Sequence, residues 1–325
     1  MPKPHVLIIT PALAQANNGN WQTAWRWSRL LQPHYRTTVA SSWQGEGADV
    51  MLALHARKSA PSALAWAHKK PAPALAVVLT GTDLYRDIHI DGSAQRALAV
   101  AAQLVVLQAC GIGALPPALQ PKAQVIFQSA KRRVSLEKPK RHLRALMVGH
   151  LREEKDPVTY WSAAVRLVDR PDVLLDHIGA ALEPHWRQAA EHTAQRCPGF
   201  RWLGGLPHGQ ARQRIQRAHV LVHPSQMEGG AHVILEAVQS GTPVLASHID
   251  GNVGMLGPHY SGYFELGDDA ALAKLLLRCR EDATFLPLLR QQCEARAPLF
   301  EPAREQQLLL QLVKTLVAPS ASQRP

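Results

Sequence analysis

The sequence has few cysteines and no long apolar segment. Only four cysteines occur in 325 residues, and no two of them form a C-x-x-C pair. We therefore expect free thiols in a reducing compartment rather than a disulfide framework. No apolar run approaches the roughly 18 residues of a membrane span, and the N-terminal apolar run is too short for a signal peptide. These absences predict a cytoplasmic protein without stable membrane insertion.

Metal-binding motifs are also missing. The sixteen histidines form no H-E-x-x-H motif and no Cys/His framework, and no D-x-D triplet occurs. His219 and His223 are four residues apart, but they lie on a predicted strand and so do not share a helical face. We therefore predict no metal site and no cofactor.

The charge of the chain is strongly positive. The net charge is +11 and the pI is near 9.8, which implies anionic partners: nucleic acid, an acidic membrane or phosphorylated small molecules. The basic residues are mostly scattered among acidic ones, with a local excess over residues 131–144. A basic helix face, a zinc module or interleaved aromatics would favour nucleic acid, and the sequence shows none of these.

Short apolar runs alternate with longer helical patterns, which predicts βαβ units and parallel sheets. We interpret the polar, basic segment 131–141 as a linker, because the same alternation starts again after it. The sequence therefore predicts an α/β fold with two Rossmann-like, doubly wound domains. The first covers residues 1–135, with a terminal helix at 301–318 packing back on it, and the second covers 142–300. Buried strands are expected at 5–10, 50–54, 75–80, 104–107, 124–127, 145–148, 173–178, 200–203, 220–223 and 244–246, with helices at 21–31 and 158–168.

The strongest motif lies in residues 220–246. A strand ends at His223, a loop carries Glu228, and a helix opens near Ala231 and ends before Gly241. Two glycines before a helix let the backbone approach a ligand closely, and the free N–H groups there favour a phosphate or a sugar oxygen. Glu228 and Glu236 can both accept hydrogen bonds from sugar hydroxyls. Taken alone, the two glutamates are equally compatible with one helix cap and one solvated side chain.

This block resembles the E-x7-E signature of retaining glycosyltransferase family 4. The segments 125–130, 148–156 and 203–210 extend the resemblance over nearly the whole chain. The resemblance implies the GT-B fold, a nucleotide-sugar donor, and an active site in the cleft between two Rossmann-like domains. It also implies a reaction that retains the configuration of the donor. Because no D-x-D triplet occurs, we expect Lys155, Arg152 and the helix N-terminus to replace a metal ion at the diphosphate.

The resemblance assigns roles to individual residues of the second domain. Glu236 matches the glutamate that holds the ribose, Glu228 the one near the donor sugar, and Lys155 the lysine that neutralises the diphosphate. The usual arginine falls on His150, next to Gly149, and Arg152 is expected to supply the missing charge. The backbone that lies against the donor sugar and diphosphate matches Gly229, Gly230 and Ala231.

In the first domain, the resemblance places a glycine loop at Asn18, Gly19 and Asn20. The family often has a second glycine where this chain has Asn20, whose side chain can donate a hydrogen bond instead. An ordinary turn between a strand and a helix explains the same residues.

The loop after the strand at 75–80 carries Thr82, Asp83 and Arg86 in place of the histidine-bearing loop of the family. Asp83 is the candidate catalytic carboxylate of this domain, although it is equally suited to cap a helix. Its position faces the acceptor side. The basic acceptor-side candidates are His55, Arg57, Lys58, Arg86 and Lys131, each of which is also explained as a solvated surface charge.

Three segments, 17–21, 79–87 and 149–157, look closest to the selenosugar synthases of selenoneine biosynthesis. This resemblance implies a UDP-sugar donor, UDP-N-acetylglucosamine, and selenophosphate as the acceptor, with a 1-seleno-sugar as the product. Selenophosphate is a strong nucleophile that needs little help from a general base, which fits the missing histidine.

Three alternatives remain open. The first is an ordinary family 4 transferase acting on a lipid or glycan hydroxyl, because the helix at 21–31 carries several tryptophans and arginines that suit a membrane surface. The second is a catalytically silent nucleotide-sugar sensor, and the presence of both glutamates argues against it. The third is a nucleic-acid binder, which rests on net charge alone.

Overall fold

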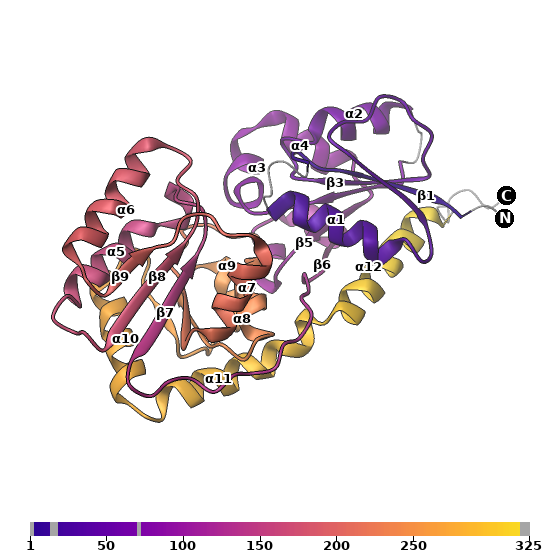
Figure 1. The fold of residues 1–325 in the computed structure, drawn as a ribbon. Coiled ribbons are helices and arrows are strands. Elements are labelled where there is room, and N and C mark those ends of the chain that lie inside the picture. Colours follow the sequence, from indigo (N-terminus) through magenta and orange to yellow (C-terminus); the bar gives the residue numbers. More distant parts are fainter. Residues whose placement is uncertain (1–2, 14–18, 70–72, 319–325) are drawn as a thin grey trace. The chain divides into compact units, whose positions relative to one another are not determined.

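The computed structural model describes residues 3–13, 19–69 and 73–318. The chain divides into two compact units, and Figure 1 shows that each unit consists of a sheet with helices packed around it. The first unit comprises Met1–Gln128 and Pro302–Pro325, and the second comprises Ser129–Glu301. Within the described ranges, no helix is both long and apolar enough to cross a membrane.

The first unit is built on a six-stranded parallel sheet in the order β2-β1-β3-β4-β5-β6. Its strands are β1 (His5–Ile9), β2 (Arg36–Ala40), β3 (Val50–Leu54), β4 (Leu75–Val78), β5 (Gln103–Val106) and β6 (Ala123–Val125). Its helices are α1 (Gly19–Leu31), α2 (Ala60–Lys69), α3 (Ile88–Ile90), α4 (Gly92–Val100) and α12 (Pro302–Val317), with a π-helical turn η2 (Asp83–Asp87) and 3-10 turns η3 (Ala109–Ile112) and η4 (Pro117–Lys122).

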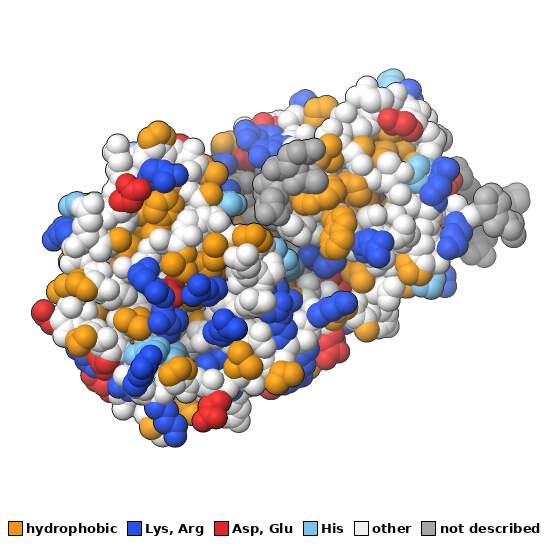
Figure 2. All heavy atoms as spheres, viewed as in Figure 1, with side chains coloured by type: hydrophobic (Ala, Val, Ile, Leu, Met, Phe, Trp, Pro, Cys, Tyr) orange, Lys and Arg blue, Asp and Glu red, His pale blue; other side chains and the backbone are white. Residues whose placement is uncertain are grey.

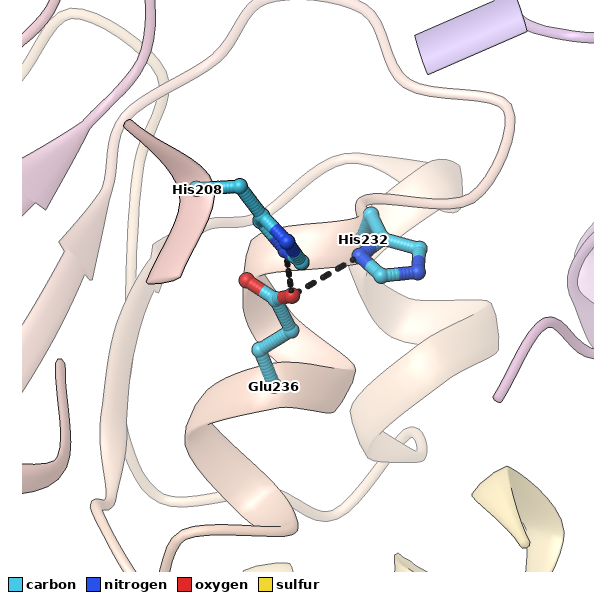
Figure 3. A group of neighbouring side chains, drawn as sticks. All are labelled: His208, His232 and Glu236. Atoms are coloured by element: carbon cyan, nitrogen blue, oxygen red, sulfur yellow. Dashed lines mark hydrogen bonds and ion pairs between the residues drawn. The ribbon is translucent and has the colours of Figure 1, made fainter. Parts of the chain in front are cut away.

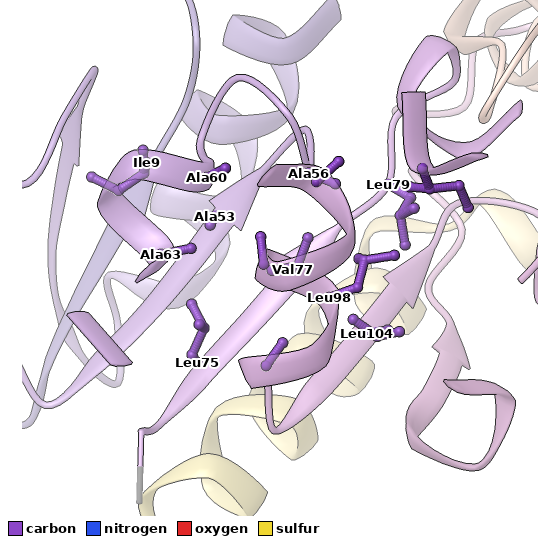
Figure 4. Close-up of a cluster of buried hydrophobic side chains, with 14 of the residues drawn as sticks. Ile9, Ala53, Ala56, Ala60, Ala63, Leu75, Val77, Leu79, Leu98 and Leu104 are labelled. Atoms are coloured by element: carbon purple, nitrogen blue, oxygen red, sulfur yellow. The ribbon is translucent and has the colours of Figure 1, made fainter. Parts of the chain in front are cut away.

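Both faces of this sheet are buried. Side chains alternate along each strand, so that Val6 and Ile8 belong to one hydrophobic cluster while Leu7 and Ile9 belong to the other. The first cluster includes residues of α1 and α12, and the second includes residues of α2 and α4 (Figure 4). A strand that is covered on both faces has a continuous apolar sequence, which is why these strands could be predicted.

The terminal helix α12 is fastened to α1 by a buried carboxylate. Glu305 is fully buried, and its oxygens accept hydrogen bonds from Trp27 Nε1 at 2.7 Å and from Arg26 Nε at 3.0 Å. The side chain of Trp27 is also fully buried. Arg26 and Trp27 therefore stabilise the first unit from within, whereas Trp25 on the same helix is exposed.

Replacing Glu305 with alanine is expected to lower the free energy of unfolding by about 3 kcal/mol, because it leaves the part-buried Arg26 without its carboxylate and the buried Trp27 Nε1 without its acceptor. Urea denaturation followed by tryptophan fluorescence measures this loss. Gln307→Ala, at an exposed position of the same helix, is the matched control and is expected to change stability by less than about 0.5 kcal/mol. Equal stability of the two variants would contradict the role of Glu305.

The second unit is also built on a six-stranded parallel sheet, in the order β12-β11-β10-β7-β8-β9. Its strands are β7 (Leu143–Val148), β8 (Val173–Ile178), β9 (Phe200–Trp202), β10 (Val220–His223), β11 (Val244–Ser247) and β12 (Tyr263–Phe264). Its helices are α5 (Pro157–Arg166), α6 (Pro184–Arg196), α7 (His208–Arg217), α8 (His232–Val238), α9 (Asp250–Leu256), α10 (Asp269–Glu281) and α11 (Phe285–Arg296), with 3-10 turns η5 (Glu153–Lys155) and η6 (Ala297–Phe300).

The structure differs from the sequence prediction in a few elements. Helix α1 starts at Gly19, so that Gly19 and Asn20 lie in its first turn rather than in a loop, and Asn18 lies outside the described residues. The strands β2 and β12 were not predicted. The segment 131–141 lacks helix and strand but is tied to the second unit, since Arg133 N donates to Gln239 O at 2.7 Å.

Candidate active site

The topology of the second sheet indicates where a ligand binds. The chain adds β8 and β9 on one side of β7, and β10, β11 and β12 on its other side. In such sheets, ligands bind outside the carboxyl ends of the strands at the point where the order reverses. That point lies between β7, which ends at Val148, and β10, which ends at His223. The loops that follow these two strands carry most of the predicted donor residues.

Lys155 and Glu228 come together at this point. Lys155 Nζ donates a hydrogen bond to Glu228 Oε1, and His223 Nε2 lies 3.1 Å from the same oxygen. Burial raises the pKa of Glu228, but the charge on Lys155 and the contact with His223 outweigh it and hold the pKa well below its ordinary value. Burial lowers the pKa of His223, and the contact with Glu228 opposes this shift without cancelling it. The pair therefore consists of a buried carboxylate and an ammonium group that is partly open to solvent.

Two backbone features hold the Glu228 loop in place. Gln226 N donates to Glu154 O at 3.0 Å, which ties this loop to the one that carries Lys155. Gly251 lies so close that an added Cβ would sit 2.2 Å from Glu228 O. Any larger residue at 251 would therefore displace the Glu228 loop, and no motif in the sequence identified this glycine.

A buried histidine, His177, holds the backbone of the loop after β7 by a hydrogen bond. His177 Nδ1 accepts a hydrogen bond from Trp161 Nε1 at 3.1 Å, so its Nε2 carries the proton and donates to Gly149 O at 3.2 Å. Burial lowers the pKa of His177 to about 4. Gly179 packs directly against the same backbone, because a Cβ at this position would lie only 1.8 Å from Gly149 O. These contacts fix the backbone at Gly149, a predicted donor-binding residue.

Acid is expected to destabilise the protein through His177. In the unfolded chain, His177 binds a proton below its ordinary pKa of about 6.5, whereas in the folded chain it stays neutral down to about pH 4. The free energy of unfolding therefore falls as the pH falls from about 6.5 to about 4. The loss from this group is about 3 kcal/mol between pH 7 and pH 4. Urea denaturation of the wild type and of His177→Gln at both pH values tests this. The variant should lose less stability than the wild type, and equal losses would refute the assignment.

Glu236 belongs to a second cluster, on α8 (Figure 3). Its Oε1 lies 2.6 Å from His208 Nε2, 3.3 Å from His232 Nδ1 and 3.6 Å from Arg212 Nε. Burial raises the pKa of Glu236, but its contacts with His208 and His232 outweigh this and keep the pKa well below the ordinary value. The carboxylate is therefore ionised, although it is only 3% exposed.

The other predicted donor residues lie near these clusters without joining them. Arg152 is half-exposed, and its Nε lies 3.9 Å from Glu154, so it is not paired with Glu228. His150 Nδ1 accepts a hydrogen bond from Ala180 N at 3.3 Å, and desolvation, with the charges of Arg152 and Lys155, lowers its pKa. Gly229, Gly230 and Ala231 lead from the Glu228 loop into α8, where Ala231 is the N-cap residue.

In the first unit, Asp83 organises the loops after β3 and β4. Its carboxylate is fully buried and accepts three backbone N–H groups, from Ala56 at 2.8 Å, Thr80 at 2.8 Å and Gly81 at 3.0 Å. These bonds occupy both oxygens. These contacts favour a positioning role for Asp83, and its selection as a catalytic candidate stays a prediction.

Four of the predicted acceptor-side residues lie around the same turn, whereas Lys131 belongs to the second unit and Asn18 lies outside the described residues. Thr82 Oγ1 lies 3.3 Å from His55 Nε2, and burial lowers the pKa of His55. Arg57 and Arg86 are both paired with Asp87, at 3.0 and 3.2 Å. The buried carboxylate of Asp87 partly balances their charges. Asp87 was not among the predicted site residues.

Comparison with known proteins identifies the family. A family model described as "Glycosyl transferases group 1" matches residues 128–299, which is more than half of the chain. The chain belongs to this glycosyltransferase family. Glycosyltransferase 1 domain-containing protein 1 of Xenopus tropicalis is 32% identical over 112 residues, which cover 34% of this chain and 32% of that protein. The match thus spans about a third of the length of that relative.

Solved structures confirm the GT-B fold of this glycosyltransferase. Sucrose-phosphate synthase of Thermosynechococcus elongatus aligns with a TM-score of 0.81 and 16% identity over 98% of this chain and 100% of that one. Anabaena HepE in complex with UDP and glucose aligns with a TM-score of 0.76 and 15% identity over 96% and 100% of the two chains. At these identities the likeness shows the fold.

The glycosyltransferase also has a basic cavity of about 480 Å³ in its second unit, which Glu228 and Glu236 do not line. Its lining includes Arg132, which pairs with Glu294, together with Arg133 and Arg290. Part of the basic segment 131–144 is therefore folded into this wall. Figure 2 shows more Lys and Arg than Asp and Glu side chains on the face in view, as the net charge requires.

Several residues of the site were not predicted from the sequence. His208 and Arg212, on α7, reach Glu236 across 28 and 24 residues of sequence, which no local pattern reveals. His232 carried a usable signal, because it precedes Glu236 by four residues on one helix. Gly179 and Gly251 matter because they lie against the backbone of Gly149 and Glu228, and these contacts join residues that are distant in the sequence.

Proposed function

We propose that this glycosyltransferase transfers a sugar from a UDP-sugar, UDP-N-acetylglucosamine, to selenophosphate, and that the product is a 1-seleno-sugar. The observation that carries the donor half of this proposal is the Lys155–Glu228 pair at the switch point of the second sheet. The UDP complexes of Anabaena HepE, which shares the fold, support a UDP donor. The acceptor rests on the resemblance of the segments 17–21, 79–87 and 149–157 to selenosugar synthases.

Lys155 is the group that stabilises the leaving diphosphate. Its ammonium group is held at the ends of β7 and β10 by Glu228, and its side chain is 18% exposed, so that an anion can reach it. A positive charge that is fixed in advance stabilises developing negative charge better than water does. Arg152 adds a second charge near this site, and a metal ion is not required.

Glu236 is the group that holds the ribose. Its carboxylate is ionised and buried, with two histidines beside it. A carboxylate can accept hydrogen bonds from two vicinal hydroxyls at once. Binding the ribose in this way orients the diphosphate toward Lys155 without taking part in the chemistry.

The transfer exchanges one bond at the anomeric carbon for another. Selenium of selenophosphate forms the C–Se bond, the C–O bond to the diphosphate breaks, and UDP leaves with the electron pair. Water then cleaves the P–Se bond, which releases phosphate and leaves the seleno-sugar. We propose retention of the α configuration through attack from the face that UDP leaves. The carboxylate of Asp83 is occupied by backbone N–H groups and is not offered as a nucleophile.

A panel of UDP-sugars, each incubated with selenophosphate, thiophosphate or simple alcohols, tests the proposal by mass spectrometry. We expect UDP and a seleno-sugar from UDP-N-acetylglucosamine and selenophosphate. If the sugar were transferred to alcohols and not to selenophosphate, the acceptor would be a hydroxyl group and the proposed acceptor would be wrong. Binding of UDP-sugars without turnover on any acceptor would indicate a sensor instead.

The rate of turnover is expected to be the same with and without EDTA. The physical reason is that Lys155 and Arg152 supply the positive charge that a divalent ion would otherwise bring to the diphosphate. Initial rates with and without EDTA, after dialysis against chelating resin, provide the measurement. Loss of turnover in chelator, restored by magnesium or manganese, would contradict this mechanism.

A further inference from the structure

Three side chains around Glu236 have the composition and spacing of a metal site. His208 opens α7, while His232 opens α8 and stands four residues before Glu236 on the same helix. Figure 3 shows both rings pointing toward one carboxylate. One ligand atom from each of the three residues lies within 4.8 Å of the other two. Two ligands at positions i and i+4 of a helix, joined by a third from another element, are a common zinc arrangement.

The surroundings of the cluster allow an ion to enter and to be held. The side chains of His208, His232 and Glu236 are 52%, 25% and 4% exposed, so that solvent reaches the histidines while the carboxylate is buried behind them. Imidazole and carboxylate donors suit zinc and its neighbours among the divalent transition metals, whereas magnesium prefers oxygen ligands alone. Three protein ligands also leave one tetrahedral position open.

One neighbouring charge opposes a cation. Arg212 Nε lies 3.6 Å from Glu236 Oε1 and carries a positive charge. Its guanidinium is also held from the other side, since Nη2 donates to Lys131 O at 3.1 Å. Arg212 therefore weakens the attraction for a cation without occupying the two histidines, and a site of moderate affinity is expected.

We propose that His208, His232 and Glu236 bind one divalent transition-metal ion of the zinc class, and that this ion and the nucleotide exclude each other. Metal binding stands on the geometry alone. The exclusion rests on the proposed function, because the ion occupies the carboxylate that we assign to the ribose. Zinc is then an inhibitor of a reaction that needs no metal.

Direct binding is the first test. Calorimetry with zinc chloride on the tag-free full chain is expected to show one ion per chain, and cobalt is expected to give the visible absorption of a tetrahedral site. His208→Asn and His232→Asn should each weaken zinc binding at least tenfold. His185→Asn is the matched control, because His185 is an exposed histidine 3.5 Å from Glu183 in the same unit, and it should bind zinc as the wild type does. Unchanged affinity in both His208→Asn and His232→Asn would overturn the site.

Competition is the second test. The affinity for UDP, measured at fixed free zinc, is expected to fall in the wild type and to be independent of zinc in the His208→Asn/His232→Asn double variant. If zinc binds at these residues and UDP affinity does not change, the proposed exclusion is wrong. If UDP does not bind even in EDTA, the proposed donor is wrong, while the zinc stoichiometry still decides the metal site.

Discussion

Replacing Lys155 with methionine is expected to lower turnover by about 100- to 1000-fold, which corresponds to about 2.7–4 kcal/mol of transition-state stabilisation. The charge that develops on the departing diphosphate would lose its nearest fixed cation. Glu228 would also lose its partner, and because burial raises its pKa, it would bind a proton more readily. Steady-state kinetics should show the loss mainly in kcat, since the interaction strengthens as the C–O bond breaks.

Two further variants make the Lys155 result specific. Lys155→Arg keeps the charge and should retain more turnover than Lys155→Met. Lys274→Met removes an exposed lysine of α10 in the same unit and should leave kcat unchanged. A Lys155→Met enzyme that is folded and has wild-type kcat would refute the role of Lys155 in the reaction.

Replacing Glu236 with glutamine is expected to weaken UDP binding by about 30- to 150-fold, because a charge-assisted hydrogen bond contributes about 2–3 kcal/mol. Glutamine keeps the size of the side chain, so Arg212 loses a charge partner without a cavity being formed. The proposed contact with the ribose would be the same in the ground state and in the transition state, so the affinity for the donor should fall more than kcat.

Calorimetry with UDP on the Glu236→Gln variant measures this effect. Glu265→Gln is the control, because Glu265 also lies beside a histidine, His248 at 3.7 Å, but at an exposed position of the same unit. Wild-type affinity for UDP in Glu236→Gln, measured in EDTA, would remove Glu236 from the donor site.

The fold was predictable because most of its strands are buried on both faces. The strand Val50–Leu54 is apolar throughout, Val173–Ile178 and Val220–His223 begin with three apolar residues, and the prediction matched the bounds of all three. β2 escaped because it is an edge strand with alternating, half-exposed residues, and β12 because it has two residues only. Edge strands carry little of the apolar signal on which such a prediction depends.

The candidate site was predictable only in part, since its residues meet through the topology of the sheet. Lys155 and Glu228 were both selected from loops after predicted strands, but their contact across 73 residues depends on β7 and β10 being neighbours. The sequence could not show that the oxygens of Asp83 are used by backbone N–H groups of two loops. For the same reason it did not reveal the metal-like group around Glu236, whose third member comes from α7.

NMR of a single reaction in EDTA, in which the full chain is given UDP-N-acetylglucosamine and selenophosphate, is the most direct test of the proposed transfer. Phosphorus spectra follow the release of UDP, and proton spectra report the coupling of the anomeric proton in the product. We expect UDP to appear at the same rate as a seleno-sugar whose small coupling constant indicates the α configuration. A product with the large coupling constant of the β configuration, or release of UDP only after a divalent metal is added, would contradict the proposed transfer.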